Sequence, residues 1–394
     1  MGSLKSTLKF LAADAVYGHM LPNAYRKACA QYPMVKGRVV FVENNGSTLS
    51  ENFSLISQRL EKHPEYSQEA VFLHETTAGL KGRLDNSKAS MRVLAEAEYI
   101  FLNDASQLVS CLPLRDGTRA FQLWHACGAF KKWGLSCVDL KYGADARMFK
   151  KHPYYANLSL VSVSSPDVSW AYQEAMGIAD ASTIKPLGVS RTDVFFNQGF
   201  LVRSKEKLAR LFPAADGKQV ILYAPTFRGR PATAATPHDL DIQLLKERFA
   251  DTHVLIIKQH PFVKDPYAIP VECASFAYEV SGELSISELL ACADVCITDY
   301  SSIVFEYSLL DRPICFFATD LEDYRSWRDF YYDFEEMTPG PVFTTSEDVV
   351  NWVDATAHRF SNDRIAEFRD KFMRACDGHS TDRICTEVFG STLE

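Results

Sequence analysis

The chain has 394 residues, which is too long for one ordinary hydrophobic core and suits two domains. Its residues are 47% hydrophobic and 23% charged, so the composition is that of a globular protein and excludes a disordered chain. The net charge of −8 disfavours a nucleic-acid partner, because phosphate neutralisation needs a basic surface. No run approaches the roughly 18 apolar residues of a membrane span, and no signal peptide is visible. We therefore expect a cytoplasmic protein, or one peripheral to the inner face of the cell membrane.

Residues 1–34 form a predicted N-terminal helical segment. Leu4, Leu8 and Leu11 recur there at helical spacing, with lysines beside them. Such a helix either lies on an anionic membrane surface or packs on the protein's own surface. Residues 1–6 also fit the N-myristoylation pattern, and a remnant of cloning fits them equally well, so the sequence does not say whether Met1-Gly2-Ser3 is native.

After this segment, short apolar runs rich in β-branched and aromatic residues alternate with helical patterns. This alternation predicts crossover units and parallel sheets covered on both faces. The first set of predicted strands comprises residues 38–42, 70–73, 99–102, 120–124 and 158–163. The second set comprises residues 220–223, 254–257, 276–280, 295–298 and 313–317, with predicted helices at 286–293, 302–310 and 346–358.

Residues 197–218 separate the two sets and contain a charged stretch and a Pro-Ala-Ala-Asp-Gly turn. We predict the domain boundary there, with one Rossmann-like domain over residues 35–200 and another over residues 215–394. The predicted fold class is α/β, with two doubly wound Rossmann-like domains facing a central cleft. Ligands of such sheets bind beyond the carboxyl ends of the strands.

Residues 296–306 place a polar turn between an apolar strand and a helix. The first N–H groups of a helix have no intrahelical partner and carry the positive end of its dipole, so a phosphate can bind there. Ser301 and Ser302 add hydroxyls, although these serines or Asp299 can equally well act as simple helix caps. Glu306, one turn into the helix, either serves a ligand or is a carboxylate favoured by the helix dipole.

Three more polar residues follow neighbouring strands of the second half. Arg228 follows the strand at 220–223, and Lys258 and His260 follow the next one. Strand ends at one sheet edge lie ~5 Å apart, so these side chains and the serine turn can surround one diphosphate. Walker and G-x-G-x-x-G motifs do not occur, which disfavours an ATPase or a dinucleotide dehydrogenase.

In the first half, His125 directly follows the apolar run that ends at Trp124. An imidazole at a strand end is suited to take a proton near neutral pH, and a core histidine bonded to backbone is the competing interpretation. Lys131 and Lys132 follow in a glycine-containing loop that can approach a charged ligand. Arg191 and Asp193 either position an acceptor or form an internal pair; these four charged residues are our acceptor-site candidates.

Six segments carry a resemblance: Trp124-His125 with its glycine and lysine loop, and residues 188–195, 223–228, 258–261, 298–302 and 331–334 with 339–341. Together they resemble the CDP-glycerol glycerophosphotransferase family, the teichoic-acid primases and polymerases of bacterial cell-wall synthesis. The resemblance covers roughly residues 35–390. It implies a GT-B fold, association with the cytoplasmic membrane face, and transfer of a polyol phosphate from a CDP-activated donor to a lipid-linked acceptor.

The resemblance also implies roles for single residues. It makes His125 the general base, and it places His260, Ser301 and Ser302 at the donor phosphates, where Arg228 and Lys258 are further candidates. Residues 35–200 become the acceptor domain and residues 215–394 the CDP-donor domain. The candidates for the donor nucleotide are Glu283, Asp299 and Glu306.

Two segments depart from the family pattern. Residues 126–131 replace the common Gly-Thr-Pro-Leu-Lys-Lys, and Arg328-Asp329-Phe330 replaces an Arg-Gly-aromatic sequence. Neither departure changes His125, but both bear on which acceptor and which polyol the protein takes.

The expected partners are CDP-glycerol or CDP-ribitol, a lipid-linked polymer acceptor and the membrane surface, and a homo-oligomer is compatible with the sequence. No carboxylate cluster predicts an obligatory metal site or cofactor, which leaves Mg²⁺ carried on the donor diphosphate. Three alternatives share this two-domain pattern. They are a GT-B glycosyltransferase with a nucleotide-sugar donor, a UDP-sugar 2-epimerase-like isomerase that needs no acceptor, and a nucleotide-binding module that releases no CMP.

Overall fold

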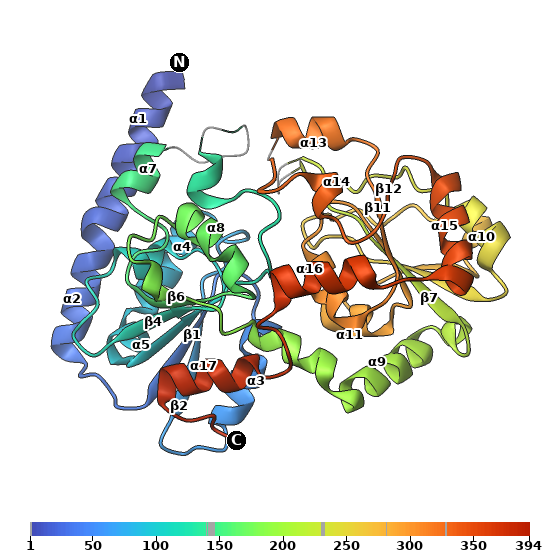
Figure 1. The fold of residues 1–394 in the computed structure, drawn as a ribbon. Helices are drawn as coiled ribbons and strands as arrows, with labels where there is room; N and C mark the ends of the chain where they lie inside the picture. Colours follow the sequence, from blue (N-terminus) through green and yellow to red (C-terminus); the bar gives the residue numbers. More distant parts are fainter. Residues whose placement is uncertain (1, 139, 141–145, 230–232, 281, 328) are drawn as a thin grey trace. The chain divides into compact units, whose positions relative to one another are not determined.

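The structure is a computed structural model that describes the chain except for residues 1, 139, 141–145, 230–232, 281 and 328. The chain divides into two compact units, unit 1 (Met1–Asp193 with Ala375–Glu394) and unit 2 (Val194–Arg374). Each unit contains one six-stranded parallel sheet with helices on both faces (Figure 1). The predicted α/β class with two doubly wound sheets is therefore confirmed.

The sheet of unit 1 has the strand order β2-β1-β3-β4-β5-β6, and every neighbouring pair is parallel. The order reverses between β1 and β3, which is where ligands bind in doubly wound sheets. The strands are β1 (Arg38–Glu43), β2 (Ser67–Phe72), β3 (Tyr99–Leu102), β4 (Arg119–Gln122), β5 (Leu158–Ser162) and β6 (Ile184–Lys185).

Alternate residues of these strands bury both faces of the sheet. On one face Val40 and Val42 pack with the helix that contains Leu21 and Tyr25. On the other face Phe41 packs with the helix that follows β1 and with the last helix of the chain. The helices are α1 (Gly2–Ala13), a π-helix η1 (Asp14–Met20), α2 (Leu21–Gln31), α3 (Glu51–Leu60), α4 (Leu80–Ala89), α5 (Met91–Glu96), α6 (Gln107–Cys111), α7 (Ala146–Lys151), α8 (Ser169–Met176) and α17 (Ser380–Phe389).

The sheet of unit 2 has the order β12-β11-β10-β7-β8-β9, again with parallel neighbours. Its order reverses between β7 and β10. The loops after β10, β7 and β8 are therefore neighbours at one edge, as the sequence predicted. The strands are β7 (Gln219–Ala224), β8 (His253–Ile257), β9 (Ala277–Glu279), β10 (Val295–Thr298), β11 (Ile314–Phe317) and β12 (Val342–Phe343).

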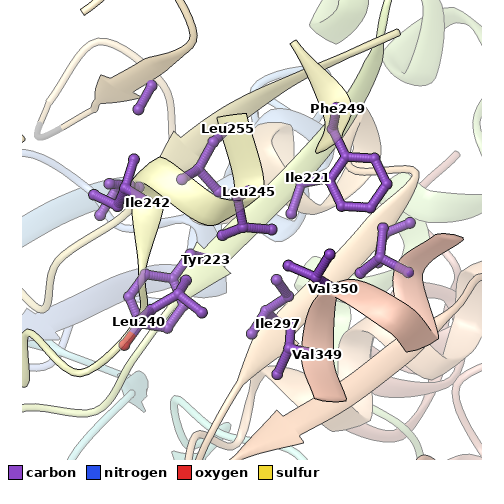
Figure 2. Packing of buried hydrophobic residues seen from close by; sticks show 14 of the residues in the cluster. Ile221, Tyr223, Leu240, Ile242, Leu245, Phe249, Leu255, Ile297, Val349 and Val350 are labelled. Carbon is purple, nitrogen blue, oxygen red and sulfur yellow. The ribbon is translucent and has the colours of Figure 1, made fainter. Parts of the chain in front are cut away.

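One face of this sheet is covered by two helices whose apolar side chains point onto the strands (Figure 2). Leu245 and Phe249 come from one helix and Val349 and Val350 from the other, and all four are buried around Ile221. The helices of unit 2 are α9 (Gln198–Leu211), α10 (Ile242–Phe249), α11 (Ile286–Cys292), α12 (Ile303–Tyr307), α13 (Leu321–Trp327), α14 (Phe334–Met337), α15 (Ser346–Arg359) and α16 (Asp363–Met373).

The observed division of the chain differs from the predicted domains in its last 20 residues. Ala375–Glu394 belongs to unit 1, although the sequence-based boundaries assigned residues 215–394 to one domain. Ile384, Cys385 and Val388 of α17 are buried in the unit 1 core beside Phe41, so this helix completes the first sheet's cover. The first crossing between the units also lies earlier than predicted, at residues 193–194.

Candidate functional site

His125 lies in the loop after β4, three residues beyond the last strand residue. The predicted strand 120–124 ends two residues earlier than expected, at Gln122. The ring is not sealed in the core, since 46% of the side chain is exposed. Its Nδ1 lies 2.9 Å from the carbonyl oxygen of Asn103 and 3.8 Å from Asp104 Oδ1. A carbonyl only accepts hydrogen bonds, so the proton sits on Nδ1 and the neutral ring presents Nε2 as a proton acceptor.

The residue before His125 adopts a strained backbone conformation. Trp124 has a φ of 61°, a left-handed conformation that is unusual for a bulky residue. Its N–H donates to Oε1 of the fully buried Gln122 at 3.0 Å, and Gln122 Nε2 donates to the carbonyl oxygen of Asp104. The indole stacks on Trp133 with 4.5 Å between ring centroids. These contacts fix the loop that carries His125 against the loop after β3.

A buried polar network lies behind Asn103. The Asn103 amide donates to Glu43 Oε2 at 2.7 Å and to Ser50 Oγ at 3.0 Å, and Ser50 N donates to Glu43 Oε1. Glu43 ends β1 and Asn103 follows β3, so the network spans the point where the strand order reverses. It fixes the carbonyl that holds the imidazole.

The acceptor candidates are placed in different surroundings. Arg191 donates to the His125 carbonyl and to Asn52 Oδ1, both at 2.7 Å, so it supports the histidine loop from behind. Asp193 accepts hydrogen bonds from Ser380 N, Thr381 N and Thr381 Oγ1 and thereby holds the start of α17. Lys131 and Lys132 are half-buried in the same loop as His125. An acceptor role for these residues stays a prediction.

In unit 2, Arg228 is the centre of an ionic cluster at the edge where β7 and β10 end. Its guanidinium donates to both carboxylate oxygens of Asp320, at 2.6 and 2.8 Å, and its Nη1 lies 3.0 Å from Asp299 Oδ2. The guanidinium also lies over the rings of Tyr300 and Tyr324. Two carboxylates and two rings thus already hold the predicted phosphate-binding arginine.

Asp299 is the deepest member of this cluster. It is fully buried, and its Oδ1 accepts the N–H groups of Thr226 and Tyr300 at 2.7 and 2.6 Å. Burial raises the pKa of Asp299, and Arg228 opposes that rise. Burial likewise disfavours ionised Asp320, but the hydrogen bonds and charge of Arg228 outweigh it and lower the pKa of Asp320. Asp299 therefore ties the loop after β7 to the turn after β10, which is a structural contact; a nucleotide contact stays a prediction.

The serine turn is present between β10 and α12, but its helix is short. α12 has five residues and continues as a 3₁₀ turn over Ser308–Leu310, where the sequence predicted one helix over 302–310. Ser302 occupies the N-cap position without a side-chain bond, and Ser301 Oγ accepts the Ile303 N–H at 3.4 Å. Glu306 is buried within α12, so both of its proposed roles stay open. A five-residue helix has a weak dipole, so hydroxyls and N–H groups are the main donors of this turn.

His260 has the opposite tautomer to His125. The N–H of Phe262 donates to His260 Nδ1 at 3.1 Å, so Nδ1 accepts and the neutral ring carries its proton on Nε2, ready to donate. Phe227 and Phe262 hold the ring, each with 4.6 Å between centroids. Lys258 is half-buried, and burial lowers its pKa against the opposing charge of Glu283. Glu283 itself is exposed.

Sequence reasoning missed several residues that shape these loops. Asn103 holds the His125 ring from the loop after β3, and Gln122 at the end of β4 holds the backbone N–H of Trp124. Asp320 holds Arg228 from 92 positions away in sequence. Polar residues at strand ends were a usable signal for Asn103, which follows the predicted strand 99–102. Gln122 and Asp320 gave none. Arg328, in the second departing segment, lies outside the described residues.

Two searches of the described residues bear on metals and membranes. No group of three or more His, Cys, Asp or Glu side chains among them is arranged to hold a metal ion. In the same part of the chain, no helix combines the length and the apolar character needed to cross a membrane.

The fold and these residues define a GT-B-type α/β protein with polar turns and a histidine at the carboxyl edge of each sheet, His125 in unit 1 and His260 in unit 2. Its sequence matches the family described as CDP-Glycerol:Poly(glycerophosphate) glycerophosphotransferase over residues 24–390. The chain belongs to that family, and the resemblance found in the sequence is confirmed.

Relatives with assigned names support this membership. The chain is 34% identical to a teichoic acid ribitol-phosphate primase of Bacillus spizizenii, covering 92% of this chain and 93% of the primase. It is also 34% identical to a teichoic acid poly(ribitol-phosphate) polymerase of that organism, but it spans only 56% of the polymerase's length. A teichoic acid glycerol-phosphate primase of Bacillus subtilis is 26% identical, with 88% of this chain and 89% of that protein covered.

Solved structures show the same fold. A structure of the wall teichoic acid polymerase TagF matches with a TM-score of 0.77 at 20% identity, covering 99% of this chain and 97% of that one. UDP-GlcNAc 2-epimerase from Neisseria meningitidis matches with a TM-score of 0.55 at 11% identity, covering 90% of this chain and 100% of that one. Both likenesses concern the fold alone.

Proposed function

We propose that this protein is a phosphotransferase that moves a polyol phosphate, glycerol phosphate or ribitol phosphate, from a CDP-activated donor to a hydroxyl of a lipid-linked teichoic-acid-like or capsular polymer, releasing CMP. Family membership over residues 24–390 supports this reaction class. The observation that carries the proposal is the pair of opposite tautomers: His125 presents an accepting Nε2 and His260 a donating one. A phosphoryl transfer to a hydroxyl needs one group that takes a proton and others that stabilise negative charge.

On the acceptor side, His125 Nε2 takes the proton of the attacking hydroxyl. The oxygen then bonds to the β-phosphorus that carries the polyol, and the bond from that phosphorus to the bridging oxygen breaks, so CMP leaves. The Asn103 carbonyl bonded to Nδ1 keeps the ring oriented and stabilises the imidazolium that forms. Asp104 Oδ1 lies 3.8 Å from Nδ1 on the same side of the ring.

On the donor side, negative charge builds on the bridging and terminal phosphate oxygens during transfer. His260 Nε2–H, the Ser301 and Ser302 turn and Lys258 are the groups we assign to these oxygens. The part-buried Arg228 also contributes positive potential, but Asp299 and Asp320 already occupy most of its donors. We therefore assign it mainly to holding the turn in place.

We choose between the two polyols by comparing the sequence identities to the relatives. The ribitol-phosphate primase and polymerase are 34% identical to this chain, whereas the Bacillus subtilis glycerol-phosphate primase is 26% identical. We therefore propose CDP-ribitol as the first donor to test. We also propose that Mg²⁺ acts only on the donor diphosphate, and that the protein works at the inner face of the cell membrane.

The experiment incubates purified protein with CDP-ribitol or CDP-glycerol and a short lipid-linked acceptor, and it measures CMP release and product mass. We expect a mass increase of one or more polyol-phosphate units. His125→Ala should reduce turnover by about 100- to 10,000-fold while donor binding is retained, because it removes proton transfer and not donor contacts. His260→Ala should weaken both turnover and donor binding.

The exposed His19 provides a control outside both loops, and His19→Ala should leave turnover unchanged. Release of CMP from neither donor would overturn the proposed function. Near-normal turnover of His125→Ala would overturn the assignment of the base. Conversion of a UDP-sugar without an acceptor would identify the isomerase alternative.

A further inference from the structure

The residue between Lys258 and His260 faces the interior of unit 2. The Lys258 N–H still donates to the Tyr223 carbonyl at 2.9 Å, so the pairing of β8 with β7 continues one residue beyond the strand. Successive side chains of an extended segment point to opposite sides. Gln259 is accordingly buried, with 8% of its surface exposed, whereas the donor-site candidates on either side of it are half-buried. Its amide therefore lies beneath the loop that carries them.

The Gln259 amide makes hydrogen bonds to three separate segments. Its Nε2 donates to the Asp265 carbonyl at 3.0 Å and to Glu279 Oε1 at 2.6 Å. Its Oε1 accepts the hydroxyl of Thr236. An amide has two donor hydrogens, and both are used here. A buried polar group that is satisfied in this way holds its partners in place, so Gln259 connects the loops after β7 and β8 with the end of β9.

The bond from Gln259 to Asp265 closes the loop that holds the His260 ring. Inside this loop the Phe262 N–H donates to His260 Nδ1 at 3.1 Å, which leaves the ring proton on Nε2. Without that bond, either ring nitrogen of the neutral imidazole can carry the proton. The tautomer of His260 therefore depends on a loop whose two ends are joined by Gln259.

The other two partners of the amide are themselves anchored. Glu279 Oε2 accepts the N–H of the buried Tyr267 at 3.0 Å, so this carboxylate holds the same loop at a second point. Thr236 is buried and follows Ala235, which exchanges two backbone hydrogen bonds with Arg228, at 2.8 and 3.1 Å. The glutamine thus ties the loop of the donor-site histidine to the segment that carries the donor-site arginine.

We propose that Gln259 is a positioning residue of the donor site, which directs the Nε2–H of His260 by holding its loop to Thr236 and Glu279. Each partner of the amide lies in a different segment at the carboxyl edge of the sheet, where ligands of doubly wound sheets bind. A donor that is already in place stabilises developing charge without rearranging during the reaction. The inference rests on the proposed function for the role of His260 at the donor phosphates.

The first test follows the ring nitrogens of His260 by ¹⁵N NMR at about pH 8, where an unperturbed imidazole is neutral. The signals are assigned by their loss in His260→Ala. Gln259→Leu removes the amide that bonds Asp265 and Glu279, and it should change the single tautomer of the wild type into a mixture of both. A folded Gln259→Leu variant with the wild-type tautomer would overturn the proposal.

The second test varies the two substrates separately in the CMP-release assay. Gln259→Leu should raise the KM for CDP-ribitol and lower kcat/KM for this donor by about 10- to 100-fold, because the proton that faces the phosphates is no longer held in place. The KM for the acceptor should stay unchanged. An equal rise of both KM values would contradict a role in the donor site, since a general loss of structure affects both substrates.

Gln243 on α10 provides the matched control for both tests. Its Nε2 also donates to a glutamate, Glu247 Oε1 at 2.9 Å, but both residues lie on one helix outside the loops that Gln259 connects. Gln243→Leu removes the same amide group from the same unit. It should leave the His260 tautomer and both KM values as they are in the wild type.

An exchange of amide and carboxylate tests the pairing itself. In Gln259→Glu, the new carboxylate faces Glu279, so two acceptors meet and the donor KM should rise. When Glu279→Gln is added, an amide again faces a carboxylate, and part of the donor affinity should return. Recovery should be incomplete, because the Asp265 carbonyl still lacks its donor. A double variant no better than Gln259→Glu would refute the role of this pair.

The NMR test separates this inference from the proposed function. A protein that releases no CMP from CDP-polyols would contradict the function, yet the tautomer of His260 would still decide the role of Gln259. If Gln259→Leu does not fold, Thr236→Val takes its place, because valine has a similar shape and removes only the hydroxyl bonded to Gln259. The same change of tautomer is expected to a smaller degree, and its absence would then overturn the proposal.

Discussion

At the scale of single residues, hydrogen bonds decide what each histidine can do. His125 and His260 both follow apolar strands in the sequence, and that pattern alone treats them alike. The structure separates them, because one Nδ1 faces a carbonyl and the other faces a backbone N–H. The tautomer follows from these partners and gives one ring an accepting Nε2 and the other a donating Nε2.

Arg228 yields the clearest prediction at this scale. Arg228→Ala should lower the free energy of unfolding by about 3–5 kcal/mol, because it leaves the fully buried Asp299 without its cation. Arg248→Ala is the control, since its pair with Asp354 is about half exposed and should contribute less than ~1 kcal/mol. Urea denaturation of both variants checks this. If both variants lost the same small amount of unfolding free energy, Arg228 would contribute to donor binding and not to the stability of the fold.

The candidate residues that sequence could find are those next to apolar strands. His125, Lys258, His260 and the serine turn were recognisable in this way. Asn103 and Asp320 were not assigned, because their effects arise from partners 22 and 92 positions away. Without a three-dimensional register, a polar side chain at a distant strand end gives no sign of which loop it will hold.

At the scale of elements, the long periodic segments were the predictable ones. Ten predicted strands are present, with ends shifted by a few residues, because their apolar runs are long enough to show a period. β6 and β12 were missed, since two residues each cannot show one. The N-terminal helical segment is also present, but its π-helical part over Asp14–Met20 carries no known pattern.

The first helix yields a prediction about membranes. Leu8 and Leu11 on α1 are 58% and 55% exposed, which is unusual for paired leucines on one helix. If α1 lies on the membrane, Leu8→Ser with Leu11→Ser should weaken binding to phosphatidylglycerol vesicles by at least about tenfold. Vesicle sedimentation measures this.

Leu80 on α4 is the control for that experiment. It is 84% exposed, so Leu80→Ser removes a comparable apolar side chain from another helix of the same unit. An equal loss of binding in both variants would assign the effect to general surface hydrophobicity. Unchanged binding of the α1 variant would favour the other interpretation, in which α1 packs on protein.

At the scale of the whole molecule, residues from distant parts of the sequence share one core. The chain leaves unit 1 at residue 193 and returns at residue 375, so α17 completes a core whose other members lie hundreds of positions earlier. Sequence reasoning placed α17 with its nearest neighbours in sequence, because it has an amphipathic pattern that suits either sheet. Only the partners of Ile384, Cys385 and Val388 decide between them.

The stability of the whole molecule should depend on the charge of Glu75, which follows β2. Burial, and then the charge of Asp104, raise the pKa of Glu75 from 4.5 to about 7, so the folded protein holds this proton more tightly than the unfolded chain does. Its contribution to stability is therefore full below about pH 4.5 and is lost as the pH rises through 7. After allowance for partial exposure, the loss is on the order of 2 kcal/mol.

Glu75→Gln cannot lose a proton, so its advantage over wild type in the free energy of unfolding should grow with pH. We expect the advantage to be small at pH 5 and on the order of 2 kcal/mol at pH 8, as measured by urea denaturation at both values. Glu65→Gln should show no such gain, because the pKa of the exposed Glu65 is lowered by hydrogen bonding and not raised by burial. A Glu75→Gln advantage that is the same at both pH values would mean that Glu75 does not titrate between them.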